Sequence, residues 1–349
     1  MYELPERLKN LAPYQPVTGN YSVRLDANES FLNTPDWLRE EIAESIKKIA
    51  FHRYPDPLCT ELREKFAAFF DIDPELVTAG NGSDELIGLI INSFLGPGEK
   101  IAMVRPDFSM YSIYAEIAGV PTAVYEKAPG SLELDRDGLI SFVKESNAKL
   151  FIFSNPCNPT SQKATMEDMV KIVESLDCLV VADEAYMDFS EGSILHLARQ
   201  YDNLILLKTC SKIGMAGIRL GFAVANPALT RVLQAVRSPY NVNTMTQAAG
   251  CIWFSHGDYI HSCVKQIKAS RDILYHELAV LSEQKTEILQ VLPSYANFVF
   301  LHLSNAQSVF HNLAQRGIAV RLMGEYLRIT AGSEMENKQL LTALEEILK

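Results

Sequence analysis

The feature that most constrains the fold is a series of short apolar runs separated by segments with helical periodicity. KLFIFS (149–154), CLVVAD (178–183) and NLILLK (203–208) carry polar residues only at their ends. Continuous apolar runs of this length suit strands that are covered on both faces, as in a parallel sheet packed between helices. The pattern therefore predicts an α/β fold of βαβ units, with further strands at 75–80, 100–104 and 121–126.

The pattern changes after about residue 226. A long amphipathic stretch at 258–283 is followed by a strand-like segment at 296–303 and a closing helix, which is typical of a smaller α+β domain. A chain of 349 residues also exceeds what one hydrophobic core usually serves. We therefore predict three parts: an N-terminal arm at 1–30, a large domain at 31–238, and a small domain at 239–349 that packs with the arm.

Charge and composition narrow the function classes. The net charge of −11 argues against nucleic acid or an anionic membrane surface as the main partner, although a few local cations could still bind a small anion. The N-terminus lacks an apolar signal segment, and no run approaches the ~18 apolar residues that a membrane span requires. Six scattered cysteines without a CxxC pair, and seven histidines without ligand spacing, lead us to expect a cytoplasmic protein with free thiols and no metal.

Polar clusters follow several predicted strands, at the sheet edge where ligands of open α/β sheets collect. GNGSDE (80–85) opens a helix after a strand, and its glycines and free N–H groups suit a phosphate, although on its own a simple capped turn explains it better. NPCNPT (155–160) suits a rigid turn that holds Asn158 at the ligand edge of the sheet; a plain loop is the alternative. Asp183 closes an apolar strand, where burial is costly unless donors or a cation meet it; helix capping is the alternative.

Lys212 stands in TCSKIGMAGIRLGF (209–222), a stretch that otherwise reads as buried. Lysine is rarely buried without a partner. Taken together, the clusters supply what a pyridoxal 5'-phosphate (PLP) site needs: Lys212 to form an imine with the aldehyde, Asp183 to keep the ring nitrogen protonated, and Tyr186 and Asn158 to hydrogen-bond the ring oxygen. Phe108 could stack on the ring or simply fill the core. We expect the phosphate to be held by Gly82, Ser83, Asp84, Thr209, Ser211 and Arg219.

These motifs resemble a known family. RYPDP (53–57), GNGSDE, RPDFSMY (105–111), NPCNPT, DEAY (183–186), SKIGMAGIRLG (211–221) and LRIT (327–330) occur in the order found in the class I/II PLP-dependent aminotransferases of fold type I, and they span nearly the whole chain. The N-terminal YQP (14–16) and LDANES (25–30) are more narrowly similar to the histidinol-phosphate aminotransferase branch. That branch also contains relatives with other substrates, among them a threonine-phosphate decarboxylase.

The resemblance implies a large domain with a seven-stranded, mainly parallel sheet between helices, a smaller α+β C-terminal domain and an N-terminal arm. It further implies a homodimer with the cofactor near the subunit interface, where Tyr54 reaches the phosphate of the neighbouring subunit's cofactor. Arg328 is expected to bind a carboxylate or phosphate of the substrate, for which a guanidinium is well suited. The other residues expected at the substrate are Tyr14, Asn28 and Arg321.

The implied activity is amino transfer from an amino donor, such as histidinol phosphate or an amino acid, to 2-oxoglutarate, by a ping-pong mechanism through a Lys212 aldimine. A decarboxylase of an amino-acid phosphate and an aminotransferase for aromatic or other amino acids are the alternatives. A third reading, a non-catalytic regulator that binds PLP, is disfavoured. Such proteins generally carry an added DNA-binding segment, and we expect no room for a basic one before the first strand near residue 75. Three departures bear on the site: Ser161 replaces the usual glycine after NPT, Arg219 follows Lys212 by seven residues where many relatives have eight, and Leu322 replaces the usual aspartate after Arg321.

Overall fold

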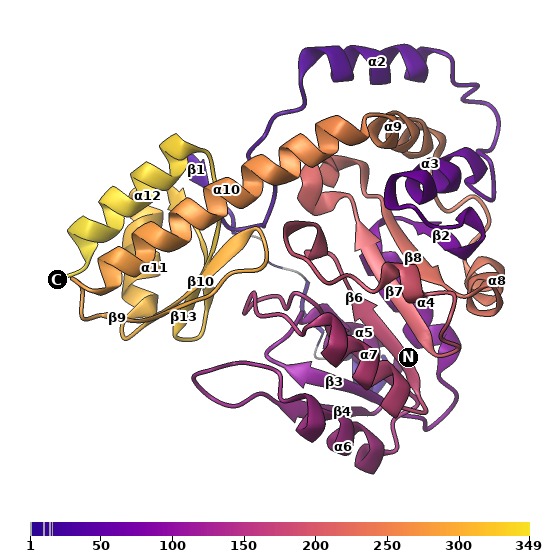
Figure 1. Cartoon of the computed structure of the whole chain (residues 1–349), viewed down its shortest axis with the longest axis horizontal. Helices are drawn as coiled ribbons and strands as arrows, with labels where there is room; N and C mark the ends of the chain where they lie inside the picture. Colours follow the sequence, from indigo (N-terminus) through magenta and orange to yellow (C-terminus); the bar gives the residue numbers. More distant parts are fainter. Residues whose placement is uncertain (1, 10, 14, 16) are drawn as a thin grey trace.

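The computed structural model describes residues 2–9, 11–13, 15 and 17–349, and its largest element is a mixed sheet of seven strands (Figure 1). The strand order is β2-β8-β7-β6-β5-β3-β4. The pairs from β7 to β4 are parallel, whereas β8 runs antiparallel to both of its neighbours. The predicted α/β fold with a mainly parallel seven-stranded sheet is confirmed. The strands are β2 (Val77–Gly80), β3 (Ile101–Arg105), β4 (Thr122–Glu126), β5 (Leu150–Ser154), β6 (Leu179–Asp183), β7 (Leu204–Thr209) and β8 (Gly221–Ala225).

The strands of this sheet are buried on both faces because their side chains alternate between two apolar clusters. In β5, Phe151 and Phe153 belong to the cluster on one face, and Leu150 and Ile152 belong to the cluster on the other. Successive side chains of a strand point to opposite faces, so a run that is apolar throughout needs helices on both. The connecting and covering helices are α2 (Asp36–Lys47), α3 (Thr60–Phe70), α4 (Gly82–Phe94), α5 (Met110–Ala118), α6 (Arg136–Ser146), α7 (Met166–Ser175), α8 (Pro227–Val236) and α9 (Thr244–Ser255).

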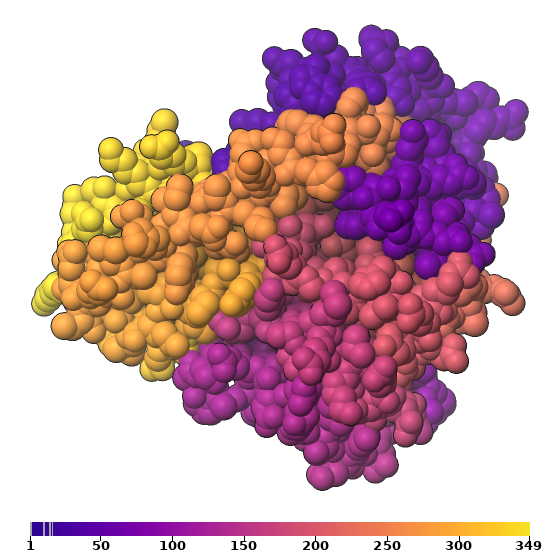
Figure 2. Space-filling view, viewed as in Figure 1, coloured from indigo at the N-terminus to yellow at the C-terminus, as the bar shows by residue number. Residues whose placement is uncertain are grey.

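A second, smaller sheet is built from the C-terminal part of the chain, with its own apolar cluster. Its four strands are antiparallel in the order β12-β13-β10-β9. The long helix α10 (Gly257–Ser282) runs from α9 to this sheet, and Figure 2 shows the orange segment continuous along this face as far as the yellow C-terminal part. The other elements here are β9 (Ile288–Leu292), β10 (Phe298–Leu303), α11 (Ala306–Gln315), β11 (Ile318–Ala319), β12 (Arg321–Met323), β13 (Tyr326–Thr330) and α12 (Glu334–Ile347).

The N-terminal segment is tied to the smaller sheet region. After α1 (Glu6–Lys9), the short strand β1 (Val23–Arg24) pairs in parallel with β11, and the Leu25 carbonyl accepts a hydrogen bond from the Thr330 N–H. The segment that follows Leu25 is thereby held between the two sheets. The division at residues 30 and 238 stays a prediction. The remaining short elements are 3₁₀ turns η1 (Pro74–Leu76), η2 (Met187–Phe189), η3 (Leu195–Leu197) and η5 (Ala216–Ile218), and a π-helical turn η4 (Ser211–Met215).

None of the helices in the described part of the chain is both long and apolar enough to cross a membrane.

Candidate active site

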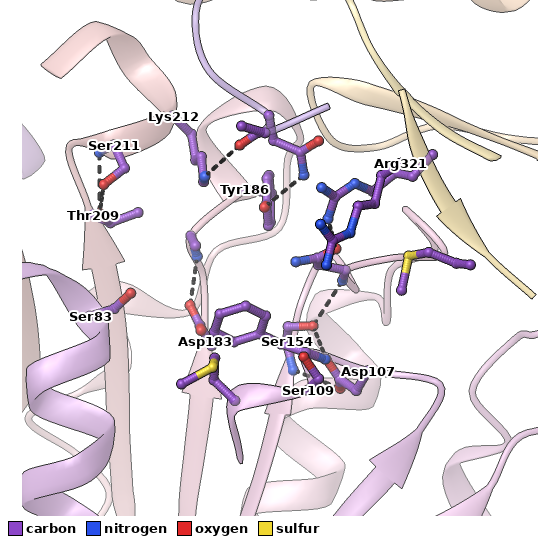
Figure 3. Close-up of a pocket in the computed structure, with 18 residues that line it drawn as sticks. Ser83, Asp107, Ser109, Ser154, Asp183, Tyr186, Thr209, Ser211, Lys212 and Arg321 are labelled. Atoms are coloured by element: carbon purple, nitrogen blue, oxygen red, sulfur yellow. Dashed lines mark hydrogen bonds between the residues drawn. The ribbon is translucent and has the colours of Figure 1, made fainter. Parts of the chain in front are cut away.

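A cavity of about 260 Å³ lies where the carboxyl ends of β5, β6 and β7 meet the smaller sheet and the N-terminal segment. In Figure 3, Ser83, Thr209 and Ser211 lie at one end and Arg321 lies at the other, with Lys212, Asp183 and Tyr186 between them. Residues far apart in the sequence therefore converge at the edge where ligands were expected. The predicted residues that line this cavity are Asn28, Ser83, Phe108, Asn158, Asp183, Tyr186, Thr209, Ser211, Lys212, Arg321 and Arg328.

Lys212 is presented by the π-helical turn that follows β7. Gly214 within this turn has a φ of 120°, a conformation that favours glycine, and a Cβ at this position would lie 3.3 Å from the Trp253 ring. The half-buried Lys212 amine donates to the Ala27 carbonyl at 3.3 Å and lies 5.8 Å from the centre of the Tyr186 ring. Lys212 therefore lines a cavity and is not enclosed by the apolar core, although the sequence around it suggested burial.

Asp183 forms the floor of the cavity at the end of β6 and is 3% exposed. Its carboxylate accepts a hydrogen bond from the Tyr111 hydroxyl at 2.9 Å and another from the Ala185 N–H at 3.0 Å. Burial raises the pKa of Asp183 to about 7, although both hydrogen bonds favour the charged form. A cation placed beside this carboxylate would lower its pKa and so oppose the effect of burial.

Tyr111 is a functional residue that the sequence analysis missed. It is buried in the first turn of α5, three residues after Phe108, which precedes the helix, and the two rings lie edge to face with their centres 5.5 Å apart. Burial, together with the nearby Asp183 charge, raises its pKa well above the usual value for tyrosine, so Tyr111 stays a neutral donor. The available signal was its place in RPDFSMY, three residues after the residue expected at the ring.

The end of the cavity near Ser83 is suited to an anion. Helix α4 begins there at Gly82, which has a φ of 76°, and the first N–H groups of a helix lack intrahelical acceptors. The Thr209 hydroxyl donates to Ser211 Oγ at 3.0 Å, and the Arg219 guanidinium reaches the same oxygen at 3.5 Å and Asp84 at 2.9 Å. Gly82, Asp84 and Arg219 do not line the cavity themselves, but they border this end of it.

Close approach of two chain segments shapes the same end. A Cβ on Gly221, the first residue of β8, would lie 2.5 Å from the backbone of Gly82 and Ser83, so only glycine fits there. Arg219 follows Lys212 by seven positions, and the six residues between them belong to the π-helical turn η4 and the 3₁₀ turn η5. With this spacing, Arg219 still contacts Ser211 and Asp84.

The opposite end of the cavity carries two guanidinium groups. Arg321 on β12 and Arg328 on β13 are directly opposite each other in the antiparallel register. Arg328 donates to the Asn158 side-chain oxygen at 2.7 Å and to the Asp26 carbonyl at 2.8 Å. Like charges directly opposite on neighbouring strands repel each other, and an anion between them would relieve that repulsion.

The N-terminal segment closes one side of the cavity. The buried Asn28 donates through its side-chain amide to the Tyr186 hydroxyl at 2.9 Å, which fixes one hydrogen bond of that phenol. Its own backbone is anchored by Thr330, which accepts from the Asn28 N–H at 3.0 Å, and by Asn297, which donates to the Asn28 carbonyl at 3.0 Å. Thr330 and Asn297 were not anticipated, because only the folded chain brings them to Asn28.

A second carboxylate, also missed, supports the turn that carries Asn158. Asp107 accepts hydrogen bonds from the backbone and the hydroxyl of Ser154, and the Ser154 hydroxyl in turn accepts from the Asn158 N–H at 3.0 Å. Burial raises the pKa of Asp107, and the Lys127 charge opposes this shift. Asp107 thereby links the segment before α5 to the NPCNPT turn.

Ser161 follows this turn at the position where the family resemblance led us to expect glycine. Its φ of 62° is in the left-handed region that glycine favours, so the serine adopts this conformation at some cost in strain. Its buried Oγ accepts hydrogen bonds from the N–H groups of Tyr295 at 2.8 Å and Ala296 at 3.0 Å. The substitution therefore adds a link between the turn and the segment before β10.

One predicted residue lies away from the cavity, and another is not among the described residues. Tyr54 is 80% exposed, stacks on Tyr240 with ring centres 4.5 Å apart, and does not line the cavity. Tyr14 lies outside the described residues. Among the described residues, no group of three histidine, cysteine or acidic side chains is placed to hold a metal ion.

The arrangement has a definite chemical character. An amine lies between an anion-binding end and a pair of guanidinium groups, above a buried carboxylate and beside a hydrogen-bonded phenol. Such a site suits a flat, phosphorylated heterocycle together with a second anionic molecule. Proton transfer at the amine is the chemistry that its position allows.

Comparison with known proteins agrees with this character. The sequence model of the family described as "Aminotransferase class I and II" matches residues 22–347. Histidinol-phosphate aminotransferase of Clostridium novyi is 37% identical over 343 residues, covering 97% of this chain and 95% of that protein. The enzyme of the same name from Thermococcus gammatolerans is 35% identical, covering 99% and 97%.

Solved structures share the fold. Histidinol-phosphate aminotransferase from Sinorhizobium meliloti, solved in complex with pyridoxal-5'-phosphate, superposes with a TM-score of 0.88 at 22% identity, covering 99% of this chain and 98% of that one. L-threonine-O-3-phosphate decarboxylase from Porphyromonas gingivalis gives a TM-score of 0.79 at 21% identity, covering 93% and 98%. At these identities the likeness concerns the fold alone, and the predicted fold type I architecture is confirmed.

Proposed function

This chain belongs to the class I and II aminotransferases, and we propose that it uses PLP to move an amino group from histidinol phosphate to 2-oxoglutarate. Relatives named histidinol-phosphate aminotransferase match nearly the full length at 34–37% identity, which favours this donor. The observation that carries the proposal is the placing of Lys212 between an anion-binding end and the Arg321–Arg328 pair.

The residues present fit PLP. Its phosphate suits the start of α4 with Ser83, Thr209, Ser211 and Arg219, and its ring nitrogen suits the buried Asp183 carboxylate, whose charge a protonated ring would stabilise. When bound, PLP supplies an aldehyde that takes up the amino group and a protonated ring that draws electrons from the donor's Cα.

The side chains have distinct tasks in the proposed reaction. Lys212 Nζ would take the proton from the Cα of the donor and pass it, within the same half-reaction, to the carbon that carried the aldehyde; with the 2-oxo acid it would move a proton in the opposite direction, to the Cα of the acceptor. Asp183, held by Tyr111, keeps the proton on the ring nitrogen. Tyr186, oriented by Asn28, donates to the ring oxygen, and Asn158 is held beside it by Arg328.

The two guanidinium groups are suited to bind the anionic groups of both substrates. Histidinol phosphate carries a phosphate and 2-oxoglutarate carries two carboxylates, so the same Arg321–Arg328 pair can bind each in turn. One cavity that serves two anionic substrates alternately is compatible with ping-pong kinetics. The phosphate decarboxylase alternative needs the same anion site and differs in which bond to Cα breaks.

We also propose that the enzyme works as a homodimer. Five large apolar side chains, Phe51, Tyr54, Leu58, Tyr240 and Met245, are exposed in the single chain, and two of them, Tyr54 and Tyr240, stack on each other at the surface. Large exposed apolar patches commonly mark protein interfaces. Equilibrium sedimentation should give the mass of a dimer; a fully active monomer would contradict this part of the proposal.

Steady-state kinetics test the proposed reaction. With histidinol phosphate and 2-oxoglutarate varied together, double-reciprocal plots should be parallel, and glutamate should form in proportion to the donor consumed. Intersecting lines would contradict the ping-pong scheme. Carbon dioxide in place of glutamate would identify the decarboxylase alternative.

A further inference from the structure

A buried lysine and cysteine lie in contact next to the active site, and the proposed reaction uses neither. Lys127 follows β4 and is 7% exposed, and Cys157 is the central residue of the NPCNPT turn and is 2% exposed. The Lys127 amine donates to Cys157 Sγ at 3.1 Å and to the Pro106 carbonyl at 3.3 Å. The two side chains are therefore neighbours in a place where both are shielded from bulk solvent.

The charge of Lys127 depends on this neighbour. Burial disfavours the ammonium form, but the charges of Cys157 and Asp107 and the hydrogen bond to the sulfur outweigh burial and raise the Lys127 pKa. Oxidation of the sulfur to a neutral group removes the contribution of Cys157. Burial then opposes the ammonium, with the Asp107 charge and the hydrogen bond to the Pro106 carbonyl left to favour it, and the balance moves toward the neutral and nucleophilic amine.

We propose that Lys127 and Cys157 form a peroxide-reactive pair that closes into a nitrogen–sulfur bond, a sulfenamide. First, the Cys157 thiolate attacks one oxygen of hydrogen peroxide; the O–O bond breaks, the sulfur becomes a sulfenic acid, and hydroxide leaves and is protonated to water. Next, Lys127 Nζ attacks the sulfur; the S–O bond breaks, and the oxygen leaves as water with a proton from the nitrogen. In sum, thiol, amine and one peroxide give the sulfenamide and two waters, with the sulfur oxidised by two electrons.

The surroundings favour closure over further oxidation. A small cavity of about 10 Å³ is lined by both residues, close to the space that one water-sized molecule needs. The Cys157 backbone is fixed on both sides, since its N–H donates to the Gln162 carbonyl at 2.8 Å and its carbonyl accepts from the Ser161 N–H at 2.7 Å. An amine already in contact reacts as part of the same molecule, whereas oxidation to the sulfinic acid requires a second peroxide.

The bond would tie a residue outside the active-site cavity to a turn that lines it. It connects the end of β4 to the NPCNPT turn, in which Asn158 directly follows Cys157. It also removes the ammonium that lies near Asp107. A thiol reductant opens the bond again and is itself oxidised to a disulfide, so the modification is reversible.

Peptide mapping of the wild-type holoenzyme tests the proposal directly. The protein is treated with hydrogen peroxide, free thiols are alkylated, and the digest with trypsin is analysed by mass spectrometry. We expect loss of cleavage after Lys127, a linked pair of peptides whose mass is two hydrogens below their sum, and recovery of both peptides after dithiothreitol. The half-buried Cys251 serves as the internal reference for exposure to the oxidant.

Three outcomes would overturn the proposal: Cys157 as a sulfinic acid with Lys127 still cleaved, an unmodified Cys157 at a peroxide dose that oxidises Cys251, or a linked pair heavier by one oxygen, which would place oxygen between the two atoms. Lys127→Arg is the matched variant, because it keeps a cation beside the sulfur and lacks the primary amine. At the dose that links the wild-type pair, Lys127→Arg should give the sulfinic acid at Cys157; an intact thiol there would contradict the trapping role of Lys127.

Discussion

Tyr111 Oη lies 2.9 Å from Asp183 Oδ2, and both side chains are buried below the cavity that Lys212 opens into. The tyrosine is a neutral donor, so it orients the carboxylate without supplying a positive charge. Burial meanwhile raises the Asp183 pKa to about 7. The carboxylate is thus held in place, and a cation beside it would stabilise its charged form. We assign that role to the protonated ring nitrogen of PLP.

Removing this hydroxyl should weaken the hold on the cofactor. We expect Tyr111→Phe to lower PLP affinity by about 10- to 100-fold, because a hydrogen bond to a charged group contributes about 1.5–3 kcal/mol. Affinity is measured by titrating the apoprotein with PLP and following the protein fluorescence. Tyr201→Phe is the control, since that tyrosine donates to the Glu174 carboxylate at 3.1 Å away from the cavity. Equal affinity of both variants would contradict the role of Tyr111.

The raised pKa of Asp183 predicts a pH dependence of apoprotein stability. Between the ordinary pKa of 3.8 and the folded value of about 7, the native state binds a proton that the unfolded state does not. The Asp183 contribution to the free energy of unfolding therefore falls as pH rises through this window, by about 1.4 kcal/mol per unit of pKa difference at most. Asp183→Asn removes this contribution.

Thermal unfolding of the two apoproteins measures this effect. The melting temperature of Asp183→Asn, relative to wild type, should rise between about pH 5 and about pH 8. A difference between the two proteins that stays constant with pH would mean that Asp183 does not titrate in this range.

Ser161 allows a test of backbone strain against hydrogen bonding. Ser161→Ala keeps a side chain at a φ of 62° and leaves the Ala296 N–H without its acceptor, while the Tyr295 N–H keeps the Ser161 carbonyl at 3.2 Å; we expect this to cost about 1–3 kcal/mol. Ser161→Gly loses the same hydrogen bonds but relieves the strain, so it should be more stable than the alanine variant by about 1 kcal/mol. Urea unfolding gives the comparison. An alanine variant as stable as wild type would remove the argument for the hydrogen bonds.

The Arg321–Arg328 pair predicts a preference for anionic donors. Arg321→Ala should lower kcat/KM for histidinol phosphate by about 10- to 100-fold, with a smaller effect on histidinol, which lacks the phosphate. Arg316→Ala, which removes the ion pair with Glu346 on the surface, is the control for a lost positive charge. If Arg321→Ala lowers both donors equally, Arg321 does not bind the phosphate.

Much of the large sheet could be predicted from the sequence, because β5, β6 and β7 are buried on both faces and are therefore apolar except near their ends. The strand β8 was not identified individually, since the five residues Gly221–Ala225 follow the lysine turn directly and resemble its small-residue composition. Strand β9 also went unnoticed, although four of its five residues are apolar.

Some residues of the candidate site could likewise be found from a local sequence pattern, and others could not. Asp183 and Lys212 stand out because a charged residue next to an apolar strand needs an explanation. Tyr111, Asp107 and Thr330 do not, because a tyrosine on a helix or a threonine at a strand end is ordinary until the fold supplies its partner. Their contacts with Asp183, Ser154 and Asn28 join segments 47 to 302 residues apart, and no local pattern records them.

The most direct test of the proposed function is a single half-reaction. The holoenzyme is mixed with histidinol phosphate in the absence of any 2-oxo acid, and the visible absorbance of the cofactor and the products are followed together. We predict loss of that absorbance with one equivalent of oxo product per site and no carbon dioxide, and no such change in Lys212→Ala. An unchanged spectrum with histidinol phosphate while another amine bleaches it, or release of carbon dioxide, would contradict the account.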